Sequence, residues 1–179
     1  MRLGGAGLAL FGFALFAPAR AAAQTVPSTQ ATALDGHSVT LPRDLPGKAT
    51  VLILGFGRHS SDATTAWEKP VRQHLAQPGS IGFYDIAMIG EIPGFVRPVV
   101  LRAIKHEVPD VLKPNFLPLT GNEDVWKQVA GYDKGQPDAA YVLLVDSTGH
   151  VQWSTHAAYS PDGFAELSRR AQSLAGAAH

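Results

Sequence analysis

The pattern of apolar residues along the chain predicts a series of β-strands. Two runs, residues 50–56 and 141–145, are apolar without interruption, which is typical of strands buried on both faces. Further strands are predicted at residues 39–41, 83–89, 116–119 and 150–153. The sequence Asp-Ser-Thr-Gly at 146–149 forms a tight turn, so the last two strands are expected to pair as a hairpin.

Between these strands, apolar residues recur at helical spacing and predict helices. The first predicted helix follows Ser60 or Ser61, either of which can cap it, and Pro70 is expected to kink it. The second helix begins near Pro93 and is expected to be kinked by Pro98. A single apolar stripe along this second helix is predicted at Phe95, Val99, Ile104 and Val108.

Two further helices are marked by the residues at their ends. Asn122 can cap the third helix, which is expected to end near Gly131. Ser160 and Pro161 open the last helix with a cap and a first-turn proline. Strands that alternate with helices, followed by an antiparallel pair and a helix, predict an α/β domain with a mixed central sheet and helices on both faces.

The first 23 residues are typical of a secretory signal peptide. Arg2 precedes the apolar run 3–17, and Ala21-Ala22-Ala23 offers small residues for cleavage. The alternative is an uncleaved membrane anchor, although the run is shorter than the about 20 residues that a spanning helix needs. We expect an exported, periplasmic protein. Its expected organisation is a signal peptide at 1–23, a flexible leader at 24–33 and one folded domain at 34–175.

Charge and cysteine content exclude several classes of function. The chain has 15 Lys and Arg and 15 Asp and Glu, and loss of Arg2 and Arg20 with the signal peptide leaves 13 basic residues. Because the chain has no basic run, a nucleic-acid partner is not expected. There is no cysteine, which excludes a disulfide framework, a thiol nucleophile, a dithiol redox pair and a thiolate metal site.

Particular segments within this order resemble the thioredoxin superfamily, in its peroxiredoxin-like and Sco-like branch. Residues 34–56 resemble the start of that fold, residues 142–153 its terminal hairpin, and residues 119–130 the strand-to-helix step of the Sco type. Overall the chain is similar to the thioredoxin-fold family of mitochondrial ATP-synthase assembly factors and their bacterial relatives. This last likeness rests on Phe56, Trp67, Pro70, 141–146 and 151–153. The resemblance covers residues 34–174 and implies a thioredoxin-like three-layer sandwich.

The resemblance also locates a redox site whose thiols are missing here. Redox members of the fold carry Cys-x-x-Cys where the first buried strand meets the first long helix, whose N-terminus lowers the thiol pKa. Depending on the register, those positions hold Ser61 and Thr64 or Asp62 and Thr65. The position of the family's cis-proline holds Ala140. We therefore expect no disulfide reductase, thiol oxidase or peroxidase activity.

The residues that bind copper in Sco-type relatives are also missing from this sequence. That site needs two thiolates and a histidine, and the histidine position falls near Asp138. Met88, in a predicted buried strand, does not replace the missing soft ligands. His59, His150 and His156 show no metal-binding spacing, so neither a metal nor another cofactor is expected.

One polar loop, Arg58 to Asp62, remains at the expected site. His59 beside two serines permits a hydrolase interpretation. A catalytic base and its orienting partner normally converge from different elements, however, so a solvated, capped helix start is favoured. The loop could also form a recognition surface, because it crowns a helix N-terminus. The candidate binding face consists of Arg58, His59, Ser60, Ser61, Asp62, Thr64, Trp67 and Ala140. Trp67 also fits the apolar helical spacing of the first helix, so a core position is its default and a partner contact is the alternative.

Two hypotheses of function follow. The first is a non-enzymatic protein that binds another envelope protein, as an assembly or chaperone-like factor for a membrane complex, which the resemblance implies. Contact with the membrane would then occur only through the partner. The second is an enzyme of an unidentified, thiol-independent reaction that uses the Arg58–Asp62 loop. A deep pocket at the site would favour the enzyme, and a groove or flat surface would favour binding.

Overall fold

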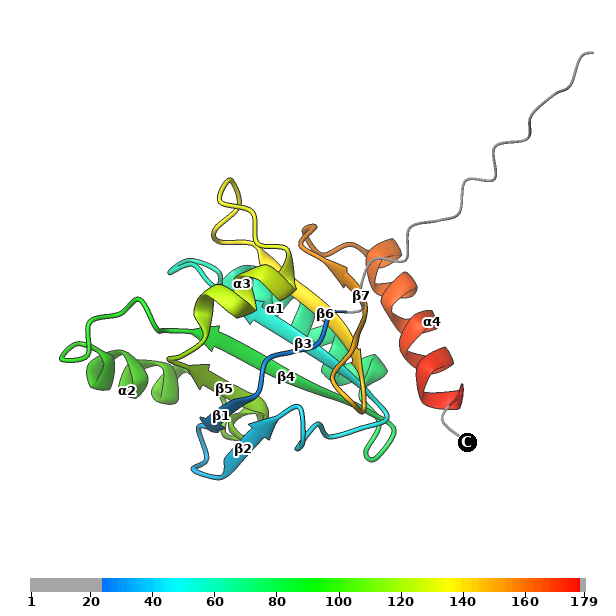
Figure 1. The fold of residues 1–179 in the computed structure, drawn as a ribbon, viewed down its shortest axis with the longest axis horizontal. Helices are drawn as coiled ribbons and strands as arrows, with labels where there is room; N and C mark the ends of the chain where they lie inside the picture. The colour runs from blue at the N-terminus through cyan, green and yellow to red at the C-terminus, as the bar shows by residue number, and fades with distance from the viewer. Residues whose placement is uncertain (1–23, 178–179) are drawn as a thin grey trace, which may run out of the picture.

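The computed structural model describes residues 24–177, so the predicted signal peptide lies outside the described residues. A five-stranded sheet in the order β5-β4-β3-β6-β7 forms the centre (Figure 1). Its strands are β5 Phe116–Leu119, β4 Ile81–Met88, β3 Ala49–Gly55, β6 Ala140–Asp146 and β7 Val151–Thr155. β4 is parallel to both β3 and β5, whereas β6 is antiparallel to both β3 and β7. The mixed sheet and the terminal hairpin are confirmed.

Two buried clusters lie on opposite faces of this sheet. Helix α1 Ser61–Pro70, its π-helical continuation η1 Val71–Leu75, and α4 Pro161–Ala177 cover one face. Helix α3 Glu123–Ala130 and a small hairpin of β1 Thr29–Thr32 and β2 Ser38–Leu41 cover the other. All residues of β3 are buried, and those of β6 are buried except for the last. The predicted three-layer α/β arrangement is therefore confirmed.

Residues 24–33, predicted as a flexible leader, instead pack on the domain. Within them, β1 pairs with β2. Val26 is 2% exposed, and the hydroxyl of Thr29 accepts a hydrogen bond from the buried indole N–H of Trp126 at 3.3 Å. The prediction is wrong because a short polar segment is stabilised here by a partner 97 residues away, which local patterns do not reveal. The folded domain therefore includes residues 24–33.

The second helix also differs from its prediction. Helix α2 Arg97–Glu107 has Pro98 in its first turn, where no backbone N–H is needed, so this proline does not kink the helix. Phe95 is 86% exposed and Val99 67% exposed, and no residue of α2 is buried. The helix lies beyond the ends of β4 and β5 (Figure 1), so this part of the apolar stripe has no sheet to pack against. A 3-10 helix, η2 Asp110–Asn115, then leads into β5.

Two predicted helix caps are absent. Ser60 occupies the position before α1, but its hydroxyl donates a hydrogen bond to the carbonyl oxygen of Gly57 at 2.8 Å. Asn122 precedes α3 in a left-handed conformation, with φ 59°. Its side-chain amide donates to the carbonyl oxygen of Ser28 at 3.3 Å, so the amide ties α3 to the N-terminal segment.

Three other helix boundaries follow the sequence. Pro70 is the last residue of α1, and the expected kink takes the form of the π-helical turn that follows it. Gly131 ends α3 with φ 64°, a left-handed conformation that favours glycine. Ser160 caps α4, because its hydroxyl accepts a hydrogen bond from the N–H of Gly163 at 3.1 Å.

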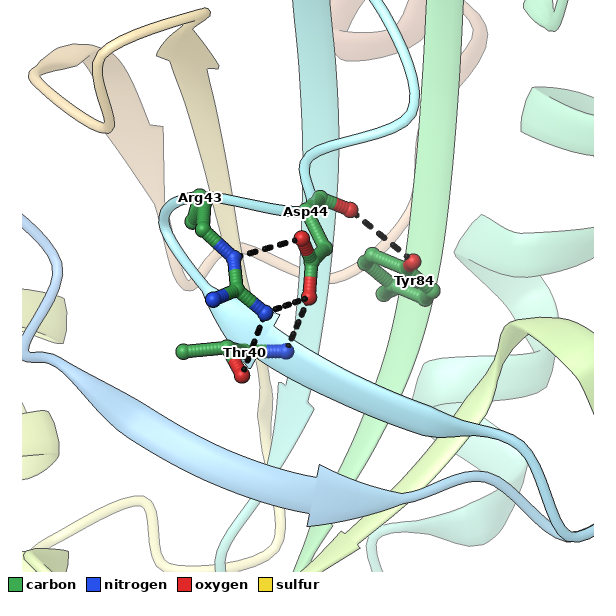
Figure 2. A network of polar contacts seen from close by, with 4 residues as sticks. All are labelled: Thr40, Arg43, Asp44 and Tyr84. Carbon is green, nitrogen blue, oxygen red and sulfur yellow. Dashed lines mark hydrogen bonds and ion pairs between the residues drawn. The ribbon is translucent and has the colours of Figure 1, made fainter.

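The connection from β2 to β3 is held by Asp44 (Figure 2). Its carboxylate accepts a hydrogen bond from the N–H of Thr40 at 2.7 Å and pairs with Arg43 at 2.9 Å. These interactions, with Arg43 the larger cause, hold the pKa of Asp44 below its ordinary value. The hydroxyl of Tyr84 on β4 donates to the Asp44 carbonyl oxygen at 3.2 Å, which links this connection to the central sheet.

No helix within residues 24–177 combines the length and the hydrophobicity needed to cross a bilayer.

Candidate functional site

The candidate site lies at the carboxyl end of β3, where residues 56–60 lead into α1 (Figure 1). The loop before β6 lies against it. A Cβ added at Gly57 would lie 2.0 Å from a carboxylate oxygen of Asp138 and 2.5 Å from the carbonyl oxygen of Pro137. Only glycine permits this close approach of the two loops.

Asp138 also binds the polar loop directly. One carboxylate oxygen of Asp138 accepts a hydrogen bond from the backbone N–H of His59 at 3.1 Å, and the other lies 3.7 Å from the imidazole Nδ1. The side chains of His59 and Asp138 are 85% and 46% exposed. The carboxylate therefore stabilises the loop conformation while the imidazole remains accessible from outside.

The serine that follows His59 points into the protein. Ser60 is 7% exposed, and its hydroxyl is engaged with Gly57. Within residues 24–177 no hydrogen bond joins His59 to Ser60 or Ser61. A nucleophilic serine needs a base within hydrogen-bond reach. This arrangement gives the hydrolase interpretation no support.

The residues predicted to form the binding face fall into an exposed group and a buried group. The exposed residues are Arg58, His59, Ser61 and Asp62. The buried residues are Ser60, Thr64, Trp67 and Ala140. The hydroxyl of Thr64 donates to the carbonyl oxygen of Ser61 at 3.2 Å, and Ala140 begins β6 beside Gly55. The exposed half of the set is thus confined to the loop and the first turn of α1.

Trp67 is a core residue, which corrects its inclusion in a binding face. It is 1% exposed, and its indole N–H donates to the carbonyl oxygen of Ala157 at 3.3 Å. Its ring also meets that of Tyr159 edge-on, with the centroids 5.4 Å apart. The sequence correctly predicted that Trp67 lies in the first helix. In the structure it lies on the face of that helix that packs into the core between α1 and α4.

An aromatic cluster beside the loop was not predicted. The ring of Phe56 lies 5.2 Å from that of Tyr132 and 5.3 Å from that of Tyr141, and His156 stacks on Tyr141 at 5.5 Å. The Tyr141 hydroxyl accepts a hydrogen bond from the N–H of Asp133 at 3.0 Å, and burial raises the pKa of Tyr141. The antiparallel pairing of β3 with β6 could have indicated this, because it places Phe56 near Tyr141.

The histidines considered as metal ligands lie in separate environments. His59 contacts Asp138, His156 stacks on Tyr141, and Nδ1 of His150 lies 2.6 Å from the hydroxyl of Thr148. Within the part of the chain that the structure describes, no three His, Asp or Glu side chains are grouped to hold a metal ion.

A shallow groove of 460 Å³ extends from the exposed loop residues along α1. It begins at Asp62, passes Thr65, Ala66 and Lys69, and reaches Tyr159, which is 38% exposed. An open groove with a partly exposed aromatic residue is suited to a polypeptide surface, whereas small-molecule sites are usually deep and enclosed. The shape of this face therefore favours binding over catalysis.

Solved structures share this architecture. The structure of yeast Sco1 is 16% identical with a TM-score of 0.54, and the match covers 84% of this chain and 96% of that chain. A SCO1/SenC family lipoprotein from Bacillus anthracis is 18% identical with a TM-score of 0.54, covering 89% and 99%. The exposed lipoprotein thioredoxin Etrx1 from Streptococcus pneumoniae is 12% identical with a TM-score of 0.57, covering 80% and 99%.

At these identities the likeness establishes the fold. The chain has the thioredoxin-like α/β fold, Sco-family proteins are among its structural neighbours, and it lacks the cysteines of redox members. A scan against protein-family models and a search of curated proteins gave no match.

Proposed function

We propose that this protein is exported and binds another envelope protein through the face around the N-terminus of α1. The face consists of Arg58, His59, Ser61, Asp62 and Asp138, and it continues along the α1 groove to Tyr159. The observation that carries the proposal is the contact between Asp138 and His59. It holds an exposed polar loop in a defined conformation at a site where this chain has no thiol.

Preorganisation of this loop supports a role in recognition. The carboxylate of Asp138 and the close packing at Gly57 limit the freedom of residues 57–59, so less conformational entropy is lost when a partner binds. Arg58 is exposed, and arginine is among the residue types enriched at the energetic centres of interfaces. The loop and the groove together present charged and apolar surface side by side.

Export and a role in assembly are supported by the neighbours in structure. Two of these neighbours are lipoproteins, and BsSco is a member of the Sco family of cytochrome c oxidase assembly proteins. The resemblance to ATP-synthase assembly factors also supports a role in the assembly of a membrane complex. On this proposal, the protein helps to assemble a membrane complex from the envelope side and performs no thiol chemistry.

Site-specific crosslinking in the native envelope tests the binding face. A photoreactive benzoylphenylalanine at Ser61 is expected to form a defined adduct, whereas the same group at Gln172, an exposed position on α4, is expected not to form it. Arg58→Glu combined with Asp62→Lys keeps the net charge and should abolish the Ser61 adduct. Equal adducts from both positions, or an adduct that survives the double substitution, would place the interaction on another surface.

Export is tested separately by mass spectrometry of the protein from its native cells. The N-terminus is expected at or near Gln24, after the predicted cleavage site. An intact Met1 in the membrane fraction would instead support the uncleaved anchor.

A further inference from the structure

A second and larger groove lies away from the candidate face, between α2 and the β1–β2 hairpin. Its volume is 710 Å³, and it shares no lining residue with the loop or with the α1 groove. The hairpin contributes the polar side chains of Gln30, Thr32, Ser38 and Thr40, and α2 contributes Leu101, Arg102 and Lys105.

Pro118 explains why this groove exists. The N–H of Leu34 donates to the carbonyl oxygen of Phe116 at 3.2 Å, and Asn122 holds the carbonyl oxygen of Ser28. β1 is therefore attached beside β5 at both ends, and Thr32 and Pro118 both line the groove between them. Proline has no N–H to donate, so a ladder cannot continue there. β1 pairs with β2 in a separate sheet, and an opening remains between the hairpin, β5 and α2.

The charge of the groove is strongly one-sided. Its lining includes the two cations Arg102 and Lys105 and, among the described residues that form it, no Asp or Glu. Neither cation forms an ion pair or a side-chain hydrogen bond with any residue of 24–177. Several other cations are paired, for example Arg72 with Glu68 at 2.6 Å and Lys127 with Glu91 at 2.7 Å. This local excess of positive charge stands out in a chain that has as many acidic as basic residues.

The spacing of the two cations matches an extended ligand. Residues three apart on a helix lie on one face, with their Cβ atoms about 5–6 Å apart. In an extended chain, alternate side chains point the same way and lie about 6.6 Å apart. A Glu-x-Glu or Asp-x-Asp segment can therefore meet Arg102 and Lys105 together, while the hydroxyl and amide groups of the hairpin satisfy its backbone.

We propose that this groove binds an acidic segment of another protein in extended conformation, with carboxylates at alternate positions paired to Arg102 and Lys105. The site lies outside the proposed α1 face and stands independently of it. It would give the protein a second contact, so that one partner could be held at two places or two partners brought together.

The test uses the mature chain and a dye-labelled peptide of eight residues that alternate Glu and Ser. Fluorescence anisotropy should show binding that weakens as NaCl is added. Arg102→Gln combined with Lys105→Gln should weaken binding about five-fold or more, which corresponds to the loss of two surface ion pairs. Amide signals of residues 30–40 and 101–105 should shift in nuclear magnetic resonance spectra of the labelled protein.

Matched controls separate this site from non-specific attraction. Lys134→Gln combined with Arg169→Gln changes the net charge equally, at exposed positions outside both grooves, and should leave affinity nearly unchanged. A peptide that alternates Lys and Ser should not bind. Equal weakening by the two double variants, or no binding of the acidic peptide, would overturn the proposal. So would displacement of the peptide by anionic lipid vesicles that bind more tightly through the same cations.

Discussion

Asp138 and His59 are joined across the candidate site, although they lie 79 residues apart in the chain. The carboxylate accepts the backbone N–H of His59 at 3.1 Å and so connects the loop after β3 to the loop before β6. In the resemblance to Sco-type proteins, the position near Asp138 is that of a copper-binding histidine. Here the same place carries a residue that positions the neighbouring loop.

Removal of this carboxylate should loosen the loop. Asp138→Ala is expected to lower the free energy of unfolding by about 0.5–1.5 kcal/mol, because one hydrogen bond is lost at a partly exposed site. Asp138→Asn should retain most of the stability, because its amide oxygen can still accept the N–H of His59. Urea unfolding of the three proteins measures both effects. Equal losses in the two variants would show that charge, and not hydrogen bonding, stabilises the loop.

The close packing of the two loops predicts a strong effect at Gly57. Gly57→Ala would place a methyl group 2.0 Å from the Asp138 carboxylate and 2.5 Å from the Pro137 carbonyl oxygen, so the loops must separate. We expect a loss of about 1–3 kcal/mol in the free energy of unfolding. Gly94→Ala is the control, because its new methyl group would meet no atom within 4 Å. Thermal unfolding measures both variants, and equal midpoints would contradict this packing.

Two large apolar side chains should differ sharply in their contribution to stability. Trp67→Ala removes a side chain that is 1% exposed and should cost about 3–5 kcal/mol through lost burial and a cavity. Phe95→Ala removes a ring that is 86% exposed and should change the free energy of unfolding by less than about 0.5 kcal/mol. Urea unfolding at one temperature measures both. A large loss at Phe95 would mean that the segment leading into α2 packs against the domain in solution.

The raised pKa of Asp85 should make the stability of the protein depend on pH. Burial, together with the negative charge of Glu68, raises the pKa of Asp85 from 3.8 to about 7. The folded chain therefore holds this proton more tightly than the unfolded chain, and stability falls as the pH rises from about 4 to about 7. Asp85→Asn removes the titrating group. Its stability relative to the unsubstituted protein should be greater at about pH 8 than at about pH 5; a constant difference would contradict the raised pKa.

The N-terminal segment should contribute to the core. Val26→Ala removes two buried methyl groups and should cost about 1.5 kcal/mol in the free energy of unfolding. Ser28→Ala, at an exposed position in the same segment, should have little effect. Unfolding followed by circular dichroism distinguishes them. If both variants matched the unsubstituted protein, residues 24–33 would behave as the leader that the sequence suggested.

Several properties of this protein follow from its sequence alone. Uninterrupted apolar runs identified β3 and β6 as strands buried on both faces, because a strand with a solvated face would need polar residues at alternate positions. The turn at Asp146–Gly149 specified the terminal hairpin. The absence of cysteine excluded thiol chemistry whatever the fold, because no arrangement of the chain can supply a missing functional group.

Other properties were decided only by tertiary structure. Local periodicity did not show that β1 is held by Trp126 or that Phe95 remains exposed. Each depends on what lies opposite the residue, and those neighbours come from distant parts of the chain. The same reason applies to both surfaces with a proposed role. Asp138 meets His59, and the β1–β2 hairpin meets α2, only after the sheet has formed, since contacts between remote segments follow from topology and not from spacing along the sequence.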